Sequence, residues 1–460
     1  MKTTLIAGVA LALAAGPALA QGFGVERPKG APPAKPPIAA KPQRAAKPAQ
    51  AAAKPATTPE QRSAAALALS SQPVFDDDTF RRIKEALLFY SDIQVRGGWP
   101  ALPADLKIAP GDSGPYVALL RQRLVISDDL APDQEAGEAY DAAVTEGVKH
   151  FQLRHGLDVT GALNAPTLKA LNVPIGARIK QLEASLQRLL GMDFTFAERY
   201  VVVNIPAAFV EAVHGDKVER RYRVIVGKID KPSPTLTATI TAVDLNPTWT
   251  VPLSITKTEI ANHMRRDPTY LSRMHMRLLG AHDEEISPSS VDWSMGRSPN
   301  FTVRQDAGNW NALGNLKIDM PNSYSVYMHD TDARKLFADD YRFDSHGCTR
   351  VDNVRDLAAW ILQDNPTGWD RAAIDAGIAT GETKIINLPH KIPVAWVYLT
   401  GWVTGDGTVE FREDVYKHDE QLDRAGLADA AAGGFVAPVP QAAPQAAPET
   451  ITQASGLDSR

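Results

Sequence analysis

The residues best suited to chemistry lie in one short stretch, Asp344 to Val351, which contains the only cysteine of the chain, Cys348. A thiol is a useful nucleophile only as thiolate, and a neighbouring imidazole can accept its proton and hold it as an ion pair. Two imidazoles are candidates, His346 within the stretch and His329 upstream. Gly347 allows a tight turn that directs backbone N–H groups toward a developing oxyanion. Arg350 adds a positive charge, so the pattern predicts nucleophilic catalysis.

Two other interpretations of these residues stay open at this point. Free cysteine is among the most buried residue types, so Cys348 could simply fill a core position. A zinc site with Cys348, His346 and His329 as ligands is the second alternative, although the paired Cys or His spacing typical of such sites is missing.

The N-terminus has the pattern of an export signal. Lys2 precedes an apolar run over residues 5–15, and Ala18-Leu19-Ala20 is a small-residue cleavage pattern. We expect a cleaved signal peptide at 1–20, a periplasmic or cell-envelope location and no membrane-spanning helix, because the run is shorter than the ~20 residues that a helix needs to cross a bilayer. A single cysteine excludes an internal disulfide. The net charge of −5 gives no reason to expect nucleic acid as a partner.

The regions between the termini differ in composition and periodicity. Residues 21–62 and 425–460 are rich in Ala and Pro and have too few large apolar side chains to fold, so we expect a linker and a disordered tail. Apolar periodicity predicts a helical scaffold at 63–110, a small helical domain at 111–173 and a connecting helix at 174–198. Strand patterns predict a mainly β domain at 199–424, with a helical cap inserted at about 257–300. The expected fold class is therefore α+β and multidomain.

The small helical domain carries a recognisable combination of residues. Phe151-Gln152 is followed by Gly156-Leu157-Asp158, then by Gly161, and Thr167 lies in the following predicted helix. This combination resembles the peptidoglycan-binding domain of many cell-wall enzymes. The resemblance covers 111–172 and implies binding to glycan or peptide.

The catalytic stretch resembles a second family. Ser345-His346-Gly347-Cys348 with an upstream His329 looks like the signature of the L,D-transpeptidases of the YkuD superfamily. The surrounding residues, which run from Asn311-Ala312-Leu313-Gly314 to Arg350-Val351, are similar to the YcbB-type subgroup. In that subgroup a scaffold, a peptidoglycan-binding domain and a capped catalytic domain occur together.

The resemblance implies a role for each residue of the site. His329 is the expected general base, oriented by the backbone carbonyl of Asp330, and Cys348 is the nucleophile. His346 and Gly347 are expected to shape the oxyanion pocket with the N–H of Cys348. The loop-ordering or donor-contacting residues are expected to be Ser345 and Arg350, with Tyr327 lining the site.

The implied reaction is acyl transfer between peptidoglycan stem peptides. Cys348 attacks the third residue of a donor tetrapeptide, D-Ala leaves, and the side-chain amine of a diamino acid in an acceptor stem completes a 3→3 cross-link. The resemblance implies no metal or cofactor, acylation by carbapenems, and work beside a glycan polymerase and a D,D-carboxypeptidase. The alternatives are an L,D-carboxypeptidase or amidase of the same fold, or a non-catalytic wall-binding protein.

Overall fold

The computed structural model describes residues 57–294 and 300–422. The expected signal peptide, tail and most of the linker lie outside these residues. The expected linker end at residue 62 is wrong, because helix α1 (Pro59–Leu67) starts earlier. Thr58 and Gln61 form a capping box at its N-terminus, and Arg62 makes two hydrogen bonds to the buried carboxylate of Asp352. Local capping and one buried ion pair thus order a segment whose composition alone suggests a flexible chain.

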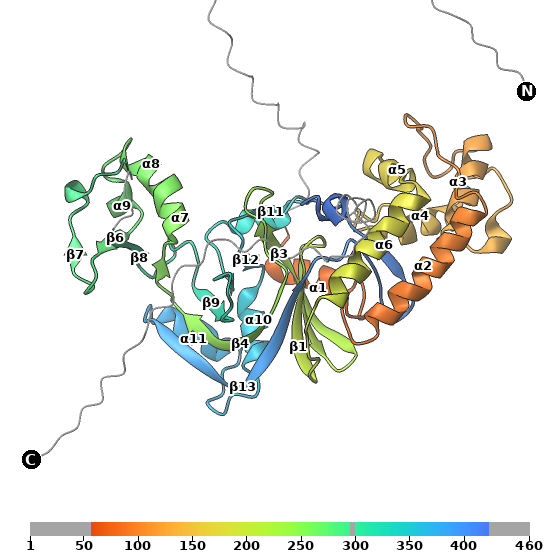
Figure 1. The fold of residues 1–460 in the computed structure, drawn as a ribbon. Coiled ribbons are helices and arrows are strands. Elements are labelled where there is room, and N and C mark those ends of the chain that lie inside the picture. The colour runs from red at the N-terminus through yellow and green to blue at the C-terminus, as the bar shows by residue number, and fades with distance from the viewer. Residues whose placement is uncertain (1–56, 295–299, 423–460) are drawn as a thin grey trace, which may run out of the picture. The chain divides into compact units, whose positions relative to one another are not determined.

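The scaffold consists of two long helices, α2 (Thr79–Val95) and α6 (Ile175–Leu190), which lie side by side (Figure 1). Apolar residues at helical spacing, including Ile83, Tyr90 and Leu182, face a shared core with one side of the catalytic sheet. Within the described part of the chain, no helix has the length and apolar character needed to cross a bilayer.

The small helical domain, called here the wall-binding module after the family that its motif resembles, contains α3 (Pro115–Ile126), η1 (Pro132–Gln134), α4 (Ala142–Arg154) and α5 (Ala165–Leu171). Its motif residues bond to one another. The fully buried amide of Gln152 accepts from the N–H groups of Thr160 and Gly161 at 2.8 Å each and donates to the hydroxyl of Thr167 at 3.0 Å. The motif therefore ties the turn after α4 to the following helix.

The catalytic domain is built on a nine-stranded sheet in the order β11-β3-β12-β10-β9-β4-β13-β1-β2, and the pairing of β2 with β3 closes the sheet on itself. Its strands are β1 (Arg199–Asn204), β2 (Phe209–His214), β3 (Lys217–Gly227), β4 (Leu236–Leu245), β9 (Leu316–Asp319), β10 (Met328–His329), β11 (Phe343–Ser345), β12 (Thr349–Val351) and β13 (Lys384–Val397).

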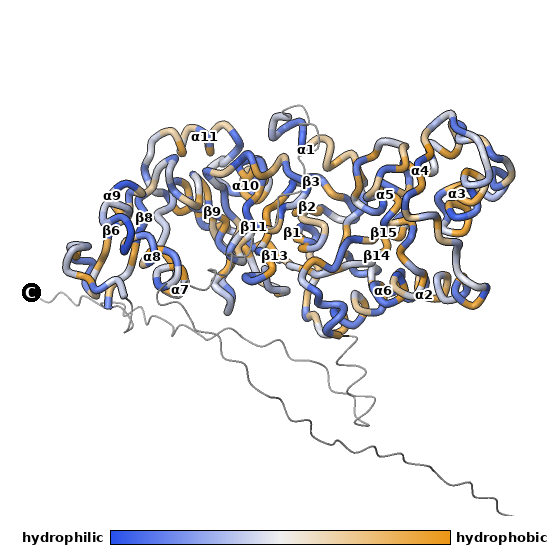
Figure 2. The backbone as a smooth tube through the Cα atoms, turned by 90° about the horizontal axis from the view of Figure 1, so that it is seen from above, coloured by the Kyte–Doolittle hydropathy of each residue, from blue (hydrophilic) through white to orange (hydrophobic). Residues whose placement is uncertain are grey.

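Both faces of much of the sheet are covered. In β1, Val201 and Val203 pack into a core shared with helices α10 (Val354–Ile361) and α11 (Arg371–Ala379), whereas Tyr200 and Val202 pack toward the scaffold. Residues 200–203 of β1, which are covered on both sides, are apolar without interruption. Figure 2 colours hydrophobic residues of the backbone orange. The expected α+β class with a mainly β catalytic domain is confirmed.

The cap has more strand than its polar sequence suggests. Its helices are short: α7 (Leu253–Ile255), the π-helical turn η2 (Thr256–Ile260), α8 (Ala261–Met264), α9 (Tyr270–Arg273) and the 3₁₀ turn η3 (Pro288–Ser290). They pack on a four-stranded sheet of β5 (Trp249–Thr250), β6 (Met276–Leu279), β7 (Glu285–Ile286) and β8 (Thr302–Gln305). Because β5 pairs with β8, the cap spans 249–305 rather than 257–300 and has its own apolar core.

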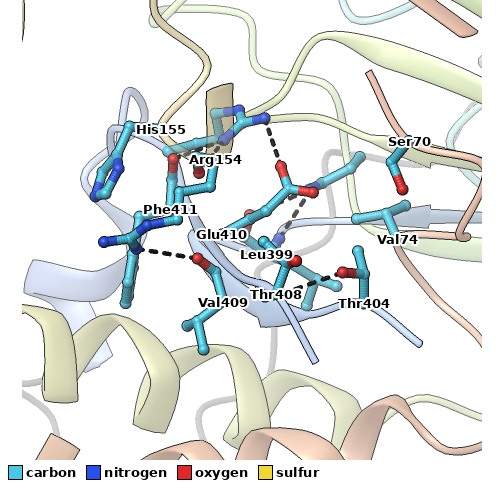
Figure 3. A network of polar contacts seen from close by, with 12 residues as sticks. Ser70, Val74, Arg154, His155, Leu399, Thr404, Thr408, Val409, Glu410 and Phe411 are labelled. Carbon is cyan, nitrogen blue, oxygen red and sulfur yellow. Dashed lines mark hydrogen bonds and ion pairs between the residues drawn. The ribbon is translucent and has the colours of Figure 1, made fainter. Parts of the chain in front are cut away.

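The hairpin of β14 (Gly401–Val403) and β15 (Val409–Phe411) contacts the wall-binding module (Figure 3). Arg154 forms a buried ion pair with Asp129 and donates to the carbonyl of Val409 at 3.1 Å. The ring of His155 stacks between Phe151 and Phe411. The hydrogen bond from Arg154 to Val409 and the stacked rings join the module to the catalytic domain at this point.

Candidate active site

The expected base and nucleophile lie on neighbouring strands. Strands β10 and β12 pair in parallel, with Met328 opposite Thr349 and His329 opposite Arg350. Side chains alternate along a strand and paired residues face the same side, so Tyr327, His329, Cys348 and Arg350 share one face. The loop between β11 and β12 brings Cys348 to the start of β12. The sheet thus brings together residues from two separate motifs.

The loop before Cys348 is held by two serine hydroxyls. Ser345, which is buried, accepts from the N–H of Gly347 at 3.2 Å and donates to the carbonyl of Cys348 at 2.6 Å. Ser233 donates to the carbonyl of Gly347 at 2.8 Å. Gly347 has φ +110°, a conformation that only glycine adopts without strain. These contacts fix the backbone turn beside the sulfur, and they place Ser345 inside the loop.

The Asp330 side chain faces away from the sulfur and organises the strand after the base. Its carboxylate accepts from the N–H of Asn315 at 3.2 Å and from Arg334 at 2.7 Å. Gly314 has φ +61°, and a Cβ there would lie 2.5 Å from the Asp330 carboxyl carbon. The glycine of the Asn311-Ala312-Leu313-Gly314 motif is therefore needed for packing against Asp330.

Burial favours the neutral forms of both catalytic groups. It lowers the pKa of His329 to about 3, with the positive charge of Arg350 acting in the same direction and the backbone of Asp330 opposing it. Burial also raises the pKa of Cys348 to about 11, while hydrogen bonds from Tyr327 and the charge of Arg350 oppose that rise. At neutral pH the free site therefore holds a thiol and a neutral imidazole, not the ion pair expected from the sequence.

The immediate surroundings of the sulfur come from Tyr327 and Arg350. Tyr327 contacts Cys348 through both backbone and side chain, and its ring meets the His329 ring edge to face at 5.6 Å. Burial raises the pKa of the Tyr327 hydroxyl, so it stays protonated and can donate a hydrogen bond. Arg350 is half-buried, and desolvation lowers the pKa of its guanidinium.

His346 points toward the cap. Its Nε2 lies 2.7 Å from Glu259 Oε1, and Glu259 also pairs with Lys231 at 3.4 Å. Glu259 belongs to the π-helical turn η2, a type of irregularity that is frequent at functional sites. The expected cap thus has a direct contact with the residue two positions before the nucleophile.

In the described residues no group of three or more His, Cys, Asp or Glu side chains could hold a metal ion, which removes support from the zinc alternative.

Sequence reasoning missed several residues that the fold brings to this face. Lys317 on β9 lies directly opposite His329, and Asp244 on β4 lies directly opposite Lys317. Glu259 from the cap was missed as well. The available signal was the alternation Lys317-Ile318-Asp319, which places two charges on the face opposite the buried Ile318.

Comparison with known proteins identifies two domains in this chain. Residues 198–386 match the family model described as L,D-transpeptidase catalytic domain, and residues 113–171 match the model described as "Putative peptidoglycan binding domain". The end of the first match at 386 falls inside β13, so the folded domain continues beyond it.

Similar proteins carry the same description. A "Putative L,D-transpeptidase" of Haemophilus influenzae is 30% identical over 264 residues, which are 57% of this chain and 52% of that protein; the chain thus spans about half the length of this curated relative. The solved L,D-transpeptidase from Mycobacterium smegmatis is 17% identical, covering 44% of this chain and 59% of that one, with a TM-score of 0.22. An L,D-transpeptidase from Xylanimonas cellulosilytica is 14% identical, covering 64% and 98%, with a TM-score of 0.18.

The family match contains His329, Cys348 and the strands that place them on one face. The module match contains the Gln152 network. This chain therefore carries an L,D-transpeptidase catalytic domain of the YkuD family together with a peptidoglycan-binding domain.

Proposed function

We propose that this protein is an L,D-transpeptidase that forms 3→3 peptidoglycan cross-links through a thioester on Cys348. The observation that carries the proposal is the placement of Cys348, behind the Gly347 turn, on the same face as His329 within the matched region. A nucleophile, a base and a preformed turn are the parts that acyl transfer requires.

Acylation begins with the neutral thiol of Cys348 and the neutral imidazole of His329. As the sulfur of Cys348 attacks the carbonyl carbon of the third donor residue, the thiol proton passes to His329. The carbonyl oxygen becomes an oxyanion, which the backbone N–H of Cys348, behind the Gly347 turn, stabilises. The carbon–nitrogen bond to the terminal D-Ala then breaks, and His329 returns the proton to the leaving amine. The products are a thioester and free D-Ala.

Deacylation uses the same groups in reverse. The neutral side-chain amine of a diamino acid in a second stem attacks the thioester carbonyl, and His329 accepts the proton that the amine loses. Cys348 leaves as thiolate and recovers its proton from His329. The thioester conserves the energy of the broken amide, so the reaction needs no nucleotide, metal or cofactor.

The remaining residues act on geometry and charge. Ser345 holds the loop, and the backbone of Asp330 opposes the fall in the pKa of the base, whereas Tyr327 and Arg350 surround the sulfur. Arg350 opposes the burial that raises the thiol pKa, and its guanidinium is the proposed contact for a donor carboxylate. His346 contributes to the oxyanion pocket through the backbone, because its ring pairs with Glu259.

The decisive test compares peptidoglycan from wild-type cells and from cells that carry Cys348→Ala. Muropeptide digestion followed by mass spectrometry should show 3→3 dimers in the wild type only. If the variant keeps its 3→3 dimers, Cys348 is not the nucleophile of cross-linking.

A test with purified protein separates transfer from hydrolysis. Incubation with tetrapeptide monomers should yield dimers and D-Ala, whereas tripeptide without dimer would identify an L,D-carboxypeptidase, and cleavage of preformed dimers only would identify an amidase. A carbapenem should add its mass to the wild type and not to Cys348→Ala. The same adduct on both proteins would show acylation elsewhere.

The expected signal peptide at 1–20 supports a place of action in the periplasm. A tetrapeptide donor must come from an enzyme that trims pentapeptides, and the glycan strands must come from a polymerase. A D,D-carboxypeptidase and a glycan polymerase are therefore the proposed functional partners, and the peptidoglycan-binding domain is the proposed anchor on the wall.

A further inference from the structure

A row of charged side chains crosses the catalytic face of the sheet. The register places Asp244 on β4 opposite Lys317 on β9, Lys317 opposite His329 on β10, and His329 opposite Arg350 on β12. Directly paired residues have Cβ atoms about 4.5–5.5 Å apart. Lys317 is therefore a direct cross-strand neighbour of the expected base.

Lys317 is held in this position from several sides. Its Nζ lies 2.5 Å from Asp319 Oδ1 and 3.3 Å from Asp244 Oδ2. The same atom lies 5.2 Å from the centre of the Tyr327 ring, which contacts both His329 and Cys348. Only a fifth of the Lys317 side chain and a tenth of the Asp244 side chain are exposed, so the pair is largely desolvated.

A buried ammonium normally loses its proton easily, but here the carboxylates more than offset the burial. The pKa of Lys317 is raised because Asp319 and Asp244 outweigh its desolvation. The pKa of Asp244 is raised to about 6, first by burial and then by the nearby charge of Asp319. Lys317 thus stays positively charged throughout the neutral range, beside two groups whose neutral forms burial favours.

We propose that Lys317 is a positioning residue whose fixed charge favours the thiolate form of Cys348, and that Asp244 and Asp319 hold this charge in place and set its strength. The inference rests on the proposed function and deepens it. A positive charge near the sulfur favours the thiolate, whereas each added carboxylate charge disfavours it.

Other groups near Cys348 also influence formation of its thiolate, and their effects must be distinguished from that of Lys317. Arg350 on β12 is the second cation that favours the thiolate, and Asp332 and Asp344 act on Arg350. Tyr327 adds hydrogen bonds to the sulfur. Substitutions of Lys317 and Asp244 leave all of these residues in the chain, so a change in the reactivity of Cys348 reports the effect of Lys317 and Asp244.

The test uses the single cysteine of the chain as its own probe. Alkylation by iodoacetamide, followed by intact mass between pH 6 and pH 10.5, reports the thiolate fraction of Cys348 alone. Lys317→Met should raise the thiol pKa by about one unit, so alkylation at pH 8 should slow about tenfold. Lys317→Arg should stay within about threefold of the wild type, because it keeps the charge.

Asp244→Asn supplies a change of opposite sign. Removing a carboxylate charge should lower the thiol pKa and speed alkylation at pH 8 about threefold. A merely structural role would shift Lys317→Met and Asp244→Asn in the same direction. Lys149→Met, which removes a lysine paired with Glu146 in the wall-binding module, is the matched control and should leave the profile unchanged.

The inference is overturned if Lys317→Met and the wild type are alkylated at the same rate at pH 8, or if Asp244→Asn also slows alkylation. If Lys317→Met does not fold, Asp244→Asn still decides the question, because it must be alkylated faster than both the wild type and Lys317→Arg. A rise in KM with an unchanged thiol pKa would instead make Lys317 a substrate contact. Alkylation needs no peptidoglycan, so failure of the proposed function would leave this result intact.

Discussion

The wall-binding module and the catalytic sheet both carry sequence motifs, yet their motif residues have different surroundings. In the module, Gln152 has hydrogen bonds at both ends of its amide, and these bonds close a turn. In the sheet, His329 is buried and Cys348 is partly buried, and both are kept neutral, with the ring atom Nδ1 of His329 lacking a partner among the described residues. Buried polar groups with a full set of hydrogen bonds stabilise a fold, whereas buried polar groups that lack partners are typical of reactive sites.

The pH dependence of thiol reactivity tests the catalytic half of this comparison most strongly. With the pKa of Cys348 at about 11, the thiolate fraction rises about tenfold for each pH unit below that value. Alkylation should therefore accelerate about a thousandfold between pH 7 and pH 10. With the pKa of His329 at about 3, imidazole protonation adds no step above pH 5. A plateau already at pH 6 would instead indicate a preformed ion pair.

Removal of the base should give the next largest effect. His329→Ala should lower the rate of D-Ala release by about 10² to 10⁴, the usual contribution of a general base. His346→Ala is the matched control and should have a much smaller effect, because its ring bonds to Glu259 in the cap. Equal losses in the two variants would contradict the assignment of His329 as the base.

Removal of a satisfied motif residue should cost stability and leave the chemistry intact. Gln152→Ala leaves buried backbone groups such as the N–H of Gly161 without a partner, at a cost of about 2 to 4 kcal/mol. Amide exchange over residues 115–171 should accelerate, while carbapenem acylation of Cys348 should not change. Gln122→Ala, an exposed change in the same module, should alter neither. Slower acylation in Gln152→Ala would mean that the two regions are coupled.

The contact between cap and catalytic loop should give the smallest effect. Glu259 and His346 are both partly exposed, and such pairs contribute about 0.2 to 1 kcal/mol. Glu259→Gln should change the melting temperature little and alter acylation by less than about fivefold. Asp283→Asn, which affects another exposed pair of the cap, provides the baseline. A loss of more than a hundredfold would make Glu259 part of the catalytic machinery.

The expected elements were mostly recovered because their signals are local. The apolar spacing of Val144, Val148 and Phe151 predicted the helix that forms the core of the module. The continuous apolar run at 200–203 predicted β1. The cap was incompletely predicted, because two-residue strands such as β5 and β7 have no periodicity and form only through pairing.

The sequence by itself determined the candidate nucleophile and the order of the two recognised domains. A single cysteine behind a glycine, with an upstream histidine, is a chemical pattern that needs no coordinates. Tertiary structure alone decided which side chains surround that cysteine. Strands β4, β9, β10 and β12 come from distant parts of the chain, and their register sets Asp244, Lys317, His329 and Arg350 in one row. Desolvation and neighbouring charge fix the protonation state, and both depend on which strands pair.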